Sequence, residues 1–248
     1  MIICACLPMT INMVIVLTKS SGGDEAAAVF NAAFGNMIGV FLTPLLIFGY
    51  LGVTGEISVL NVFYKLALRV LLPIFIGQIL RKYSSNVRKF VQKFKPKFKS
   101  LQEWCIVYIV YTVFCKTFQS DIQTSVGGVF SMIACQFAIL SLLMILAWFT
   151  LKAFFGNQPT LRVMGLFGST HKTMAMGIPL ITAIYDNDSN VGFYTLPLMV
   201  WHPMQLIIGS YLAPRLSEFV IREEKRLYDL TILHQTDTEI ATPSSEND

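Results

Sequence analysis

The polar run Gly168-Ser169-Thr170-His171-Lys172-Thr173 lies in the middle of a segment otherwise apolar enough to cross a bilayer. A charged side chain at membrane depth costs about 2.5–3.5 kcal/mol on insertion scales. Gly168 on one side, and Gly177 with Pro179 on the other, are residue types that allow a helix to break. Many transporters form a binding site from a broken helix and a buried polar cluster. The stretch therefore predicts a binding site within the membrane.

The composition indicates an integral membrane protein. The chain has 248 residues, of which 54% are hydrophobic and 14% are charged, and its mean hydropathy is +0.59. Soluble domains usually carry about 25% charged residues. A helix needs about 20 apolar residues to span the hydrocarbon core. On that basis we expect an all-α polytopic membrane protein with about seven spans, near residues 1–18, 26–48, 58–80, 104–120, 128–154, 161–185 and 192–213.

The loops predict the orientation. Between Arg81 and Lys99 lie eight Lys and Arg residues and no acidic residue, so we expect this loop in the cytoplasm. Counting spans from it places the C-terminus in the cytoplasm and the acidic loop 186–188 on the other side. The basic loop either only fixes the topology, which we favour, or also binds anionic lipid headgroups. From about Leu216 the chain becomes charged, which predicts a short amphipathic segment and then a disordered tail.

The first two predicted spans contain a second polar set. Pro8 interrupts the first span and is followed by Asn12, while Asn31 and Asn36 lie on the second span. Asn31 and Asn36 are five residues apart, so they lie on neighbouring but distinct helix faces. Two interpretations stay open for these amides. They form interhelical hydrogen bonds worth about 0.6 kcal/mol each, or their oxygens bind Na⁺ together with carbonyls freed at a helix break.

Other polar residues are less specific. Lys65 and Arg69 are four residues apart on the third predicted span, where they line a cavity, form an ion pair or extend to the interface. The sequence has no nucleophile elbow, HExxH zinc motif, P-loop or dinucleotide fingerprint. We therefore predict no enzymatic activity, no catalytic residue, no metal centre and no cofactor, apart from Na⁺ as a coupling ion. The net charge of +4 comes from localised clusters and indicates no nucleic-acid partner.

Two motif blocks carry a resemblance to a known family. The first block resembles the bile acid:sodium symporter family, and the second resembles the crossover helix of that family's divergent branch. The resemblance covers about residues 1–215. The first block is Leu7-Pro8, Leu17-Thr18-Lys19, Gly22-Gly23-Asp24-Glu25-Ala26-Ala27, Phe30-Asn31-Ala32-Ala33, Gly35-Asn36 and Leu42-Thr43-Pro44, and the second is Gly168-Ser169-Thr170-His171-Lys172-Thr173 with Gly177-Ile178-Pro179.

The resemblance implies a fold of ten helices in two inverted five-helix repeats, in which two discontinuous helices cross and hold sodium. On this mapping the chain starts at the fourth helix of the family. We therefore expect an N-terminally shortened or alternatively spliced form, in which the ten-helix fold is incomplete. The implied organisation is a partial core domain at 1–50, panel helices at 51–122 with the basic loop 81–99, a core domain at 123–213 with the crossover helix at 168–179, and a mostly disordered cytoplasmic tail at 214–248.

The resemblance also assigns site residues. Asn12 matches a sodium-ligand asparagine of the family, and Asn31 matches a hydroxyl ligand. Near Leu166 the family's bile acid carriers have a glutamate that this chain lacks, and Lys172 lies nearby. We hypothesise that the Lys172 ammonium takes the space and charge of one sodium ion. The candidate ion- and substrate-binding residues are Asn12, Asn31, Asn36, Ser169, Thr170, His171, Lys172 and Thr173.

Three functions follow from these observations. The first is a sodium- or ion-coupled symporter of an organic anion or other solute, in contact with membrane lipid. For it the resemblance implies a role in calcium homeostasis and the secretory pathway, at the plasma membrane, endoplasmic reticulum or Golgi apparatus. The second is a non-transporting regulator that acts on the calcium-entry machinery. The third, a seven-helix receptor, is disfavoured because no acidic–arginine pair closes the third predicted span.

Overall fold

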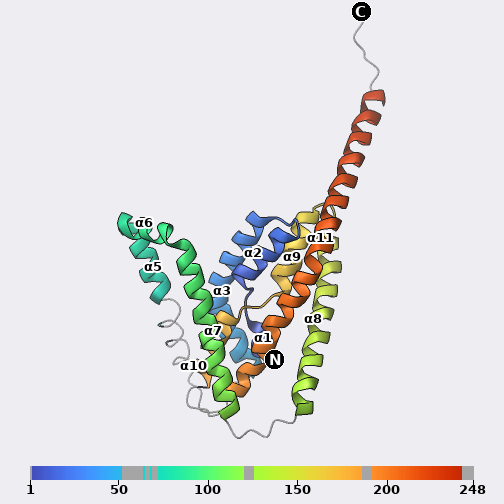
Figure 1. The fold of residues 1–248 in the computed structure, drawn as a ribbon. Coiled ribbons are helices and arrows are strands. Elements are labelled where there is room, and N and C mark those ends of the chain that lie inside the picture. The colour runs from blue at the N-terminus through green and yellow to red at the C-terminus, as the bar shows by residue number, and fades with distance from the viewer. Residues whose placement is uncertain are drawn as a thin grey trace, which may run out of the picture. The chain divides into compact units, whose positions relative to one another are not determined.

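The computed structural model describes residues 2–51, 64, 68, 72–119, 126–185 and 191–241. This part of the chain is helical, and its only strand-like pairing is one isolated bridge. The all-helical class predicted from the sequence is confirmed for these residues (Figure 1). The helices are α1 (Ile2–Cys6), α2 (Ile11–Ser20), α3 (Glu25–Leu51), α5 (Leu72–Tyr83), α6 (Ser85–Lys93), α7 (Lys95–Gln119), α8 (Val126–Phe154), α9 (Pro159–Thr170), α10 (Met174–Ile184) and α11 (Val191–Ala241).

Among the described residues, three helices are long and apolar enough to cross a membrane. These segments are Glu25–Ile47, Gly127–Phe154 and Val191–Leu233, and they contain most of the predicted spans 26–48, 128–154 and 192–213. The chain is therefore a multi-pass membrane protein.

The other predicted spans have different outcomes. Spans 1–18 and 161–185 are each divided into two short helices, α1 with α2 and α9 with α10. Helix α7 contains most of span 104–120, and most of span 58–80, with Lys65 and Arg69, lies outside the described residues. The acidic loop 186–188 also lies outside them. The total of seven spans and the ten-helix inverted repeat stay predictions.

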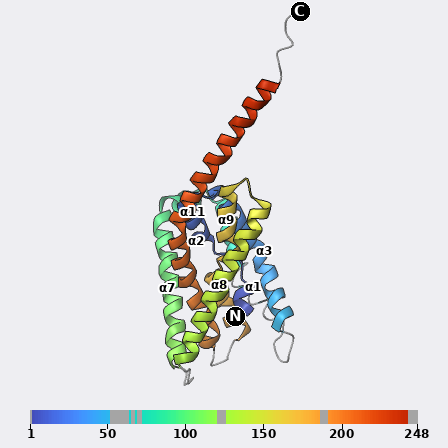
Figure 2. The same ribbon diagram turned by 90° about the vertical axis from the view of Figure 1, so that its right-hand side faces the viewer.

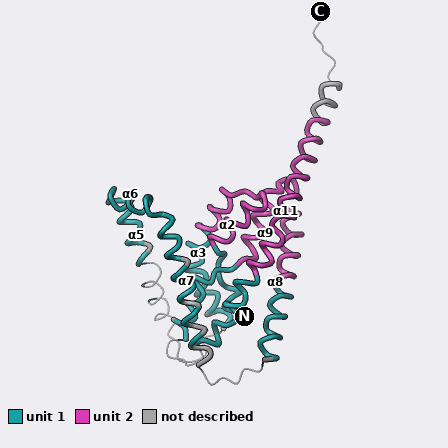
Figure 3. The backbone as a smooth tube through the Cα atoms, in the orientation of Figure 1, with its two compact units in different colours: residues 1–10, 34–139, 172–204 teal, residues 11–33, 140–171, 205–248 magenta. Residues whose placement is uncertain are grey.

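The chain forms two compact units, which Figure 3 colours separately. Unit 1 comprises residues 1–10, 34–139 and 172–204, and unit 2 comprises residues 11–33, 140–171 and 205–248. The chain passes from one unit to the other at both helix interruptions, after Thr10 and after His171. The division into panel and core domains stays a prediction.

In unit 2, the sequence of the turn between α2 and α3 explains its geometry. Gly22 has a φ of +68°, a left-handed conformation that residues with a Cβ atom rarely adopt. The Gly22 N–H donates to the Lys19 carbonyl at 3.3 Å, and the Gly23 N–H donates to the Thr18 carbonyl at 2.8 Å. This pair of bonds is the Schellman helix end. The Asp24 carboxylate then accepts from the Ala27 N–H at 2.9 Å and caps α3.

The predicted disordered tail at 214–248 is wrong as far as Ala241. Helix α11 continues without interruption from Val191 to Ala241, and its last turns extend beyond the other helices of unit 2 in both views (Figures 1 and 2). Residues 215–241 contain neither Gly nor Pro, and Arg226 pairs with Glu223 one helical turn away at 3.2 Å. Low hydrophobicity alone does not imply disorder, because these residues favour an exposed helix. Residues 242–248 lie outside the described part.

Replacement of Gly22 tests the turn. We expect Gly22→Ala to lower the stability of the folded protein by about 1 kcal/mol, because alanine pays the cost of the left-handed conformation. The matched control is Gly49→Ala in α3, where an added Cβ meets no atom within 4 Å. Thermal unfolding of the purified protein in detergent measures both variants. Equal melting temperatures for the two variants would contradict this account of the turn.

Candidate functional site

In unit 1, the two helix interruptions are paired through their backbones. The first lies between Cys6 and Ile11, and the second lies between Thr170 and Met174. Met9 and Lys172 form an antiparallel bridge, and the Thr173 N–H donates to the Pro8 carbonyl at 2.9 Å. A proline cannot donate a backbone hydrogen bond, so Pro8 enters this pairing only as an acceptor.

Side chains of α3 satisfy the neighbouring carbonyls of the first interruption. The Thr43 hydroxyl donates to the Cys6 carbonyl at 3.0 Å, and the Asn36 amide nitrogen donates to the Met9 carbonyl at 2.8 Å. A backbone group left without a partner in hydrocarbon costs several kcal/mol. Asn36, one of the predicted site residues, therefore supports the interrupted backbone directly.

Glycines allow the elements of unit 1 to approach closely. A Cβ added at Gly39 of α3 would lie 2.8 Å from the Pro8 ring. A Cβ added at Gly177 of α10 would lie 2.6 Å from Leu7 Cδ1, and closer still to the Leu198 side chain. Both distances are far below ordinary van der Waals contact. A side chain larger than hydrogen would therefore not fit at either position without a shift of its neighbours.

In unit 2, the polar end of α9 forms a separate buried cluster. His171 is completely buried, with Nδ1 3.0 Å from the Thr170 hydroxyl and Nε2 3.1 Å from the Gln205 carbonyl of α11. The Thr170 hydroxyl also lies 2.7 Å from the Leu166 carbonyl. Gly209 makes room for the ring, because a Cβ there would lie 3.0 Å from Nε2. His171 thus connects the end of α9 to α11.

These contacts restrict the hydrogen positions on the imidazole. The Gln205 carbonyl can only accept, so Nε2 carries a hydrogen. The single hydroxyl hydrogen of Thr170 points either to His171 Nδ1 or to the Leu166 carbonyl. In the first case the ring is neutral, and in the second Nδ1 donates to the hydroxyl and the ring is charged. Rotation of one hydroxyl lets His171 keep both contacts in either protonation state.

The remaining predicted residues of unit 2 are less enclosed. The Asn31 amide nitrogen donates to the Ala27 carbonyl at 2.9 Å and lies 3.8 Å from the Met164 sulfur of α9. Asn12 is exposed on the first turn of α2, and Ser169 is exposed with its hydroxyl donating to the Leu166 carbonyl at 3.2 Å. The structure therefore brings Asn36 to Met9, which forms the bridge with Lys172 in unit 1. It brings Thr170 to His171 in unit 2, where Asn31 contacts α9.

Sequence reasoning missed several of these contacts. Thr43 and Gln136 are polar side chains within apolar helices. Burying such a side chain in the membrane costs free energy, so both positions could have been recognised in the sequence as places where a hydrogen-bond partner is needed. Gln136 donates to the Pro197 carbonyl at 2.9 Å within unit 1. Gln205 contributes its backbone carbonyl to His171, and a backbone group has no sequence signal. Among the described residues, no group of three or more His, Cys, Asp and Glu side chains is arranged for a metal ion. The assignment of the predicted residues as ion or substrate ligands stays a prediction.

A pair of glycine variants in α3 tests the first interruption. We expect Gly39→Ala to destabilise the protein by about 1–3 kcal/mol, because the new methyl group overlaps the rigid Pro8 ring. Gly35→Ala is the control one helical turn earlier, where the added Cβ meets only the flexible end of Met9 at 3.6 Å. Thermal unfolding in detergent compares them. If Gly39→Ala is as stable as Gly35→Ala, Pro8 is not packed against α3.

Comparisons with known proteins find relatives of this sequence. A model of the SBF-like CPA transporter family matches residues 1–218. The chain is 32% identical over 230 residues to sodium/bile acid cotransporter 7 of Xenopus tropicalis, covering 90% of this chain and 65% of that protein. It is 33% identical over 227 residues to the protein of the same name from Rattus norvegicus, covering 89% and 64%.

A bacterial protein extends the similarity. An uncharacterized protein of Pseudomonas aeruginosa is 30% identical over 217 residues, which cover 86% of this chain and 63% of that protein. The chain spans slightly less than two thirds of the length of the curated relatives it matches.

Proposed function

We propose that this chain, which belongs to the SBF-like CPA transporter family, acts in a secondary transporter that couples an ion gradient to the movement of a small organic solute. One observation carries the proposal most directly, namely the backbone pairing of two helix interruptions at Met9 and Lys172. Secondary transporters bind substrate and coupling ion at discontinuous helices of this kind. The relatives named sodium/bile acid cotransporter 7 support sodium and an organic anion as the first candidates.

The amide side chains support a role in coordinating a monovalent cation. At Asn31 the amide nitrogen is engaged by the Ala27 carbonyl, so the amide oxygen is the atom that would coordinate the ion. At Asn36 the nitrogen is engaged by the Met9 carbonyl. In this proposal Asn36 acts with the carbonyls of the interrupted backbone in unit 1, and Asn31 and Asn12 act within unit 2, since neutral oxygens suit Na⁺.

Lys172 distinguishes this chain from the family's bile acid carriers, which the resemblance describes as having a glutamate nearby. Those carriers have a glutamate near the position that Leu166 occupies in this chain, and Leu166 is buried. Lys172 is half-buried next to the paired backbones. We propose that its ammonium takes the place and charge of one sodium ion, which gives uncoupled or proton-linked behaviour where that ion would otherwise bind. The two protonation states open to His171 support a proton-linked mechanism.

A second part of the proposal concerns the role of the protein in the cell. We propose that the protein serves calcium homeostasis and the secretory pathway, with the basic loop 81–99 and the C-terminus in the cytoplasm. The support is the resemblance to the divergent branch of the family and the asymmetric distribution of Lys and Arg. Regulation of the calcium-entry machinery without transport is the competing function.

Uptake by the purified protein in liposomes tests the transport function. A panel of organic anions is presented while the Na⁺ gradient and the pH gradient are varied independently. We expect at least one solute to accumulate only when a gradient is imposed, because coupling requires it. Absence of uptake for every solute and gradient, with folded protein in the vesicles, would contradict transport and favour the regulatory function.

Charge removal at Lys172 tests the coupling. We expect Lys172→Gln to make uptake more dependent on Na⁺, because a sodium ion is then needed to supply the missing positive charge. The control is Lys152→Gln at the exposed end of α8, which should leave the ion dependence as in the parent protein. Initial uptake rates at graded Na⁺ concentrations measure both. A folded Lys172→Gln variant with an unchanged ion requirement would rule out this role of the ammonium.

A further inference from the structure

The basic loop folds into a compact structure of unit 1 that transport does not use. Helix α6 runs from the end of α5 to the start of α7 and packs against both (Figure 1). We call this region the basic cap and define it as residues 81–99. It contains eight cationic side chains and no acidic one: Arg81, Lys82, Arg88, Lys89, Lys93, Lys95, Lys97 and Lys99.

Three of these cations line one pocket. Arg81 and Lys82 at the end of α5, Arg88 of α6, and Gln78 border an open pocket of about 420 Å³. Positive side chains that share a pocket repel one another, and an anion bound among them relieves that repulsion. Arginine and lysine with an amide side chain are the donor set that recognises phosphate oxygens. Three cationic side chains border the pocket, whereas a single phosphate group carries a charge of only about −1.5 to −2.

Exposed side chains on the parts of α5 and α7 that adjoin the basic cap indicate that this pocket lies at the level of the lipid headgroups. On α5, Phe75, Ile76 and Ile79 are exposed within two turns of Arg81, and on α7 Leu101 and Trp104 are exposed shortly after Lys99. Exposed apolar side chains belong in lipid, and an exposed tryptophan is typical of the membrane interface. The cationic residues therefore lie where the apolar helices leave the bilayer.

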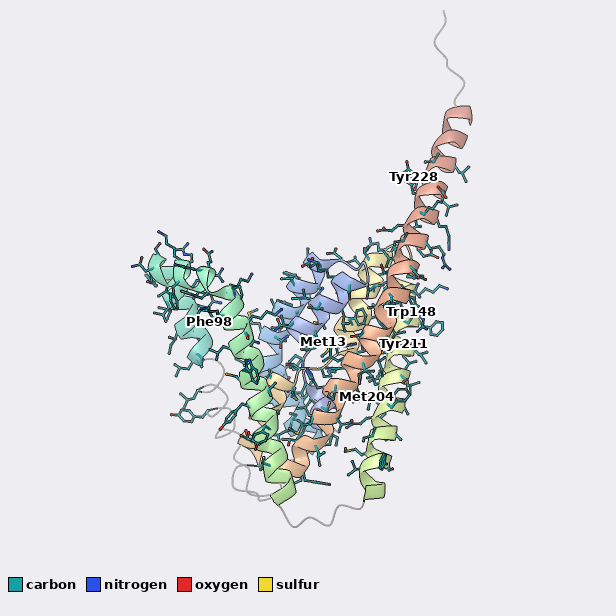
Figure 4. All side chains as sticks on the ribbon, viewed as in Figure 1. Met13, Phe98, Trp148, Met204, Tyr211 and Tyr228 are labelled. Atoms are coloured by element: carbon teal, nitrogen blue, oxygen red, sulfur yellow. The ribbon has the colours of Figure 1, made fainter. Side chains whose placement is uncertain are left out.

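Aromatic residues extend this interfacial surface along the cap. The Phe90 ring lies 4.8 Å from Phe94 and 6.1 Å from Phe98, measured between ring centroids, and Phe98 lies on the first turns of α7 (Figure 4). Phe90 and Val91 of α6 are about half exposed. A short helix that carries cationic side chains together with exposed apolar ones, as α6 does with Phe90 and Val91, is typical of a helix lying in the membrane interface.

We propose that the basic cap binds an anionic phospholipid of the surrounding membrane whose headgroup carries more than one phosphate. Arg81, Lys82 and Arg88 hold the phosphates in their shared pocket, while the acyl chains follow the exposed apolar side chains of α5. The alternative occupant, a soluble phosphate, would use the cations but not the adjoining apolar surface. This inference is independent of the transport function.

The test uses the purified protein in phosphatidylcholine nanodiscs and a fluorescent short-chain phosphatidylinositol bisphosphate, with binding followed by anisotropy. One variant neutralises the pocket by Arg81→Gln, Lys82→Gln and Arg88→Gln. The matched control neutralises three cap lysines outside the pocket by Lys95→Gln, Lys97→Gln and Lys99→Gln, so both variants lose the same charge. We expect the pocket variant to bind about tenfold or more weakly and the control to change by less than about threefold.

Several results would overturn the proposal. Equal weakening in the two triple variants would mean that the cap acts only as a diffuse positive field. Displacement of the lipid by inorganic phosphate at matched concentration would assign the pocket to a soluble anion. Absence of binding to the parent protein would remove the site altogether. Thermal unfolding confirms that both variants remain folded, and these measurements do not depend on whether the protein transports any solute.

Discussion

A bilayer interior has no water to satisfy a broken backbone, so every interrupted helix needs hydrogen-bond partners from the protein. The first interruption meets this constraint at three carbonyls: Cys6 accepts from the Thr43 hydroxyl, Pro8 from the Thr173 N–H and Met9 from the Asn36 amide. Much of unit 1 follows from these contacts. Helix α3 must approach the segment closely, which requires a glycine facing Pro8, and the two interruptions must lie side by side in antiparallel orientation.

The residues show how much of this could be predicted. Pro8 and the polar run ending at Thr173 identified both interruptions, because helix breakers and buried charges have a known cost in apolar sequence. The uninterrupted spans 26–48 and 128–154 were also predictable from their length and hydropathy. The partners were not, since His171 contacts a backbone carbonyl of Gln205 and the sequence gives no signal for such a group. The continuation of α11 to Ala241 was also not predicted, because the residues after 214 are of low hydrophobicity.

The contacts divide the candidate residues by role. Asn36 and Thr173 donate hydrogen bonds to backbone carbonyls of the first interruption. Their replacement is therefore expected to affect the stability of the protein as well as the binding of any ligand. Lys172 and His171 are the positions where charge can change within a fixed arrangement of backbone bonds. They are consecutive in the chain and belong to different units. This division explains why the proposed coupling rests on the charge of Lys172, whereas the lipid site rests on a separate part of unit 1.

A designed disulfide tests the pairing of the interruptions most directly. Residues facing each other in an antiparallel pair have Cα atoms about 4.5–5.5 Å apart, within the range that a disulfide spans. The double variant Met9→Cys and Lys172→Cys is made in a background in which all five native cysteines are replaced by alanine. Mild oxidation of the membrane-embedded protein should join the two positions, which mass spectrometry of the linked peptides detects. Failure of residues 9 and 172 to cross-link in folded protein would contradict the account.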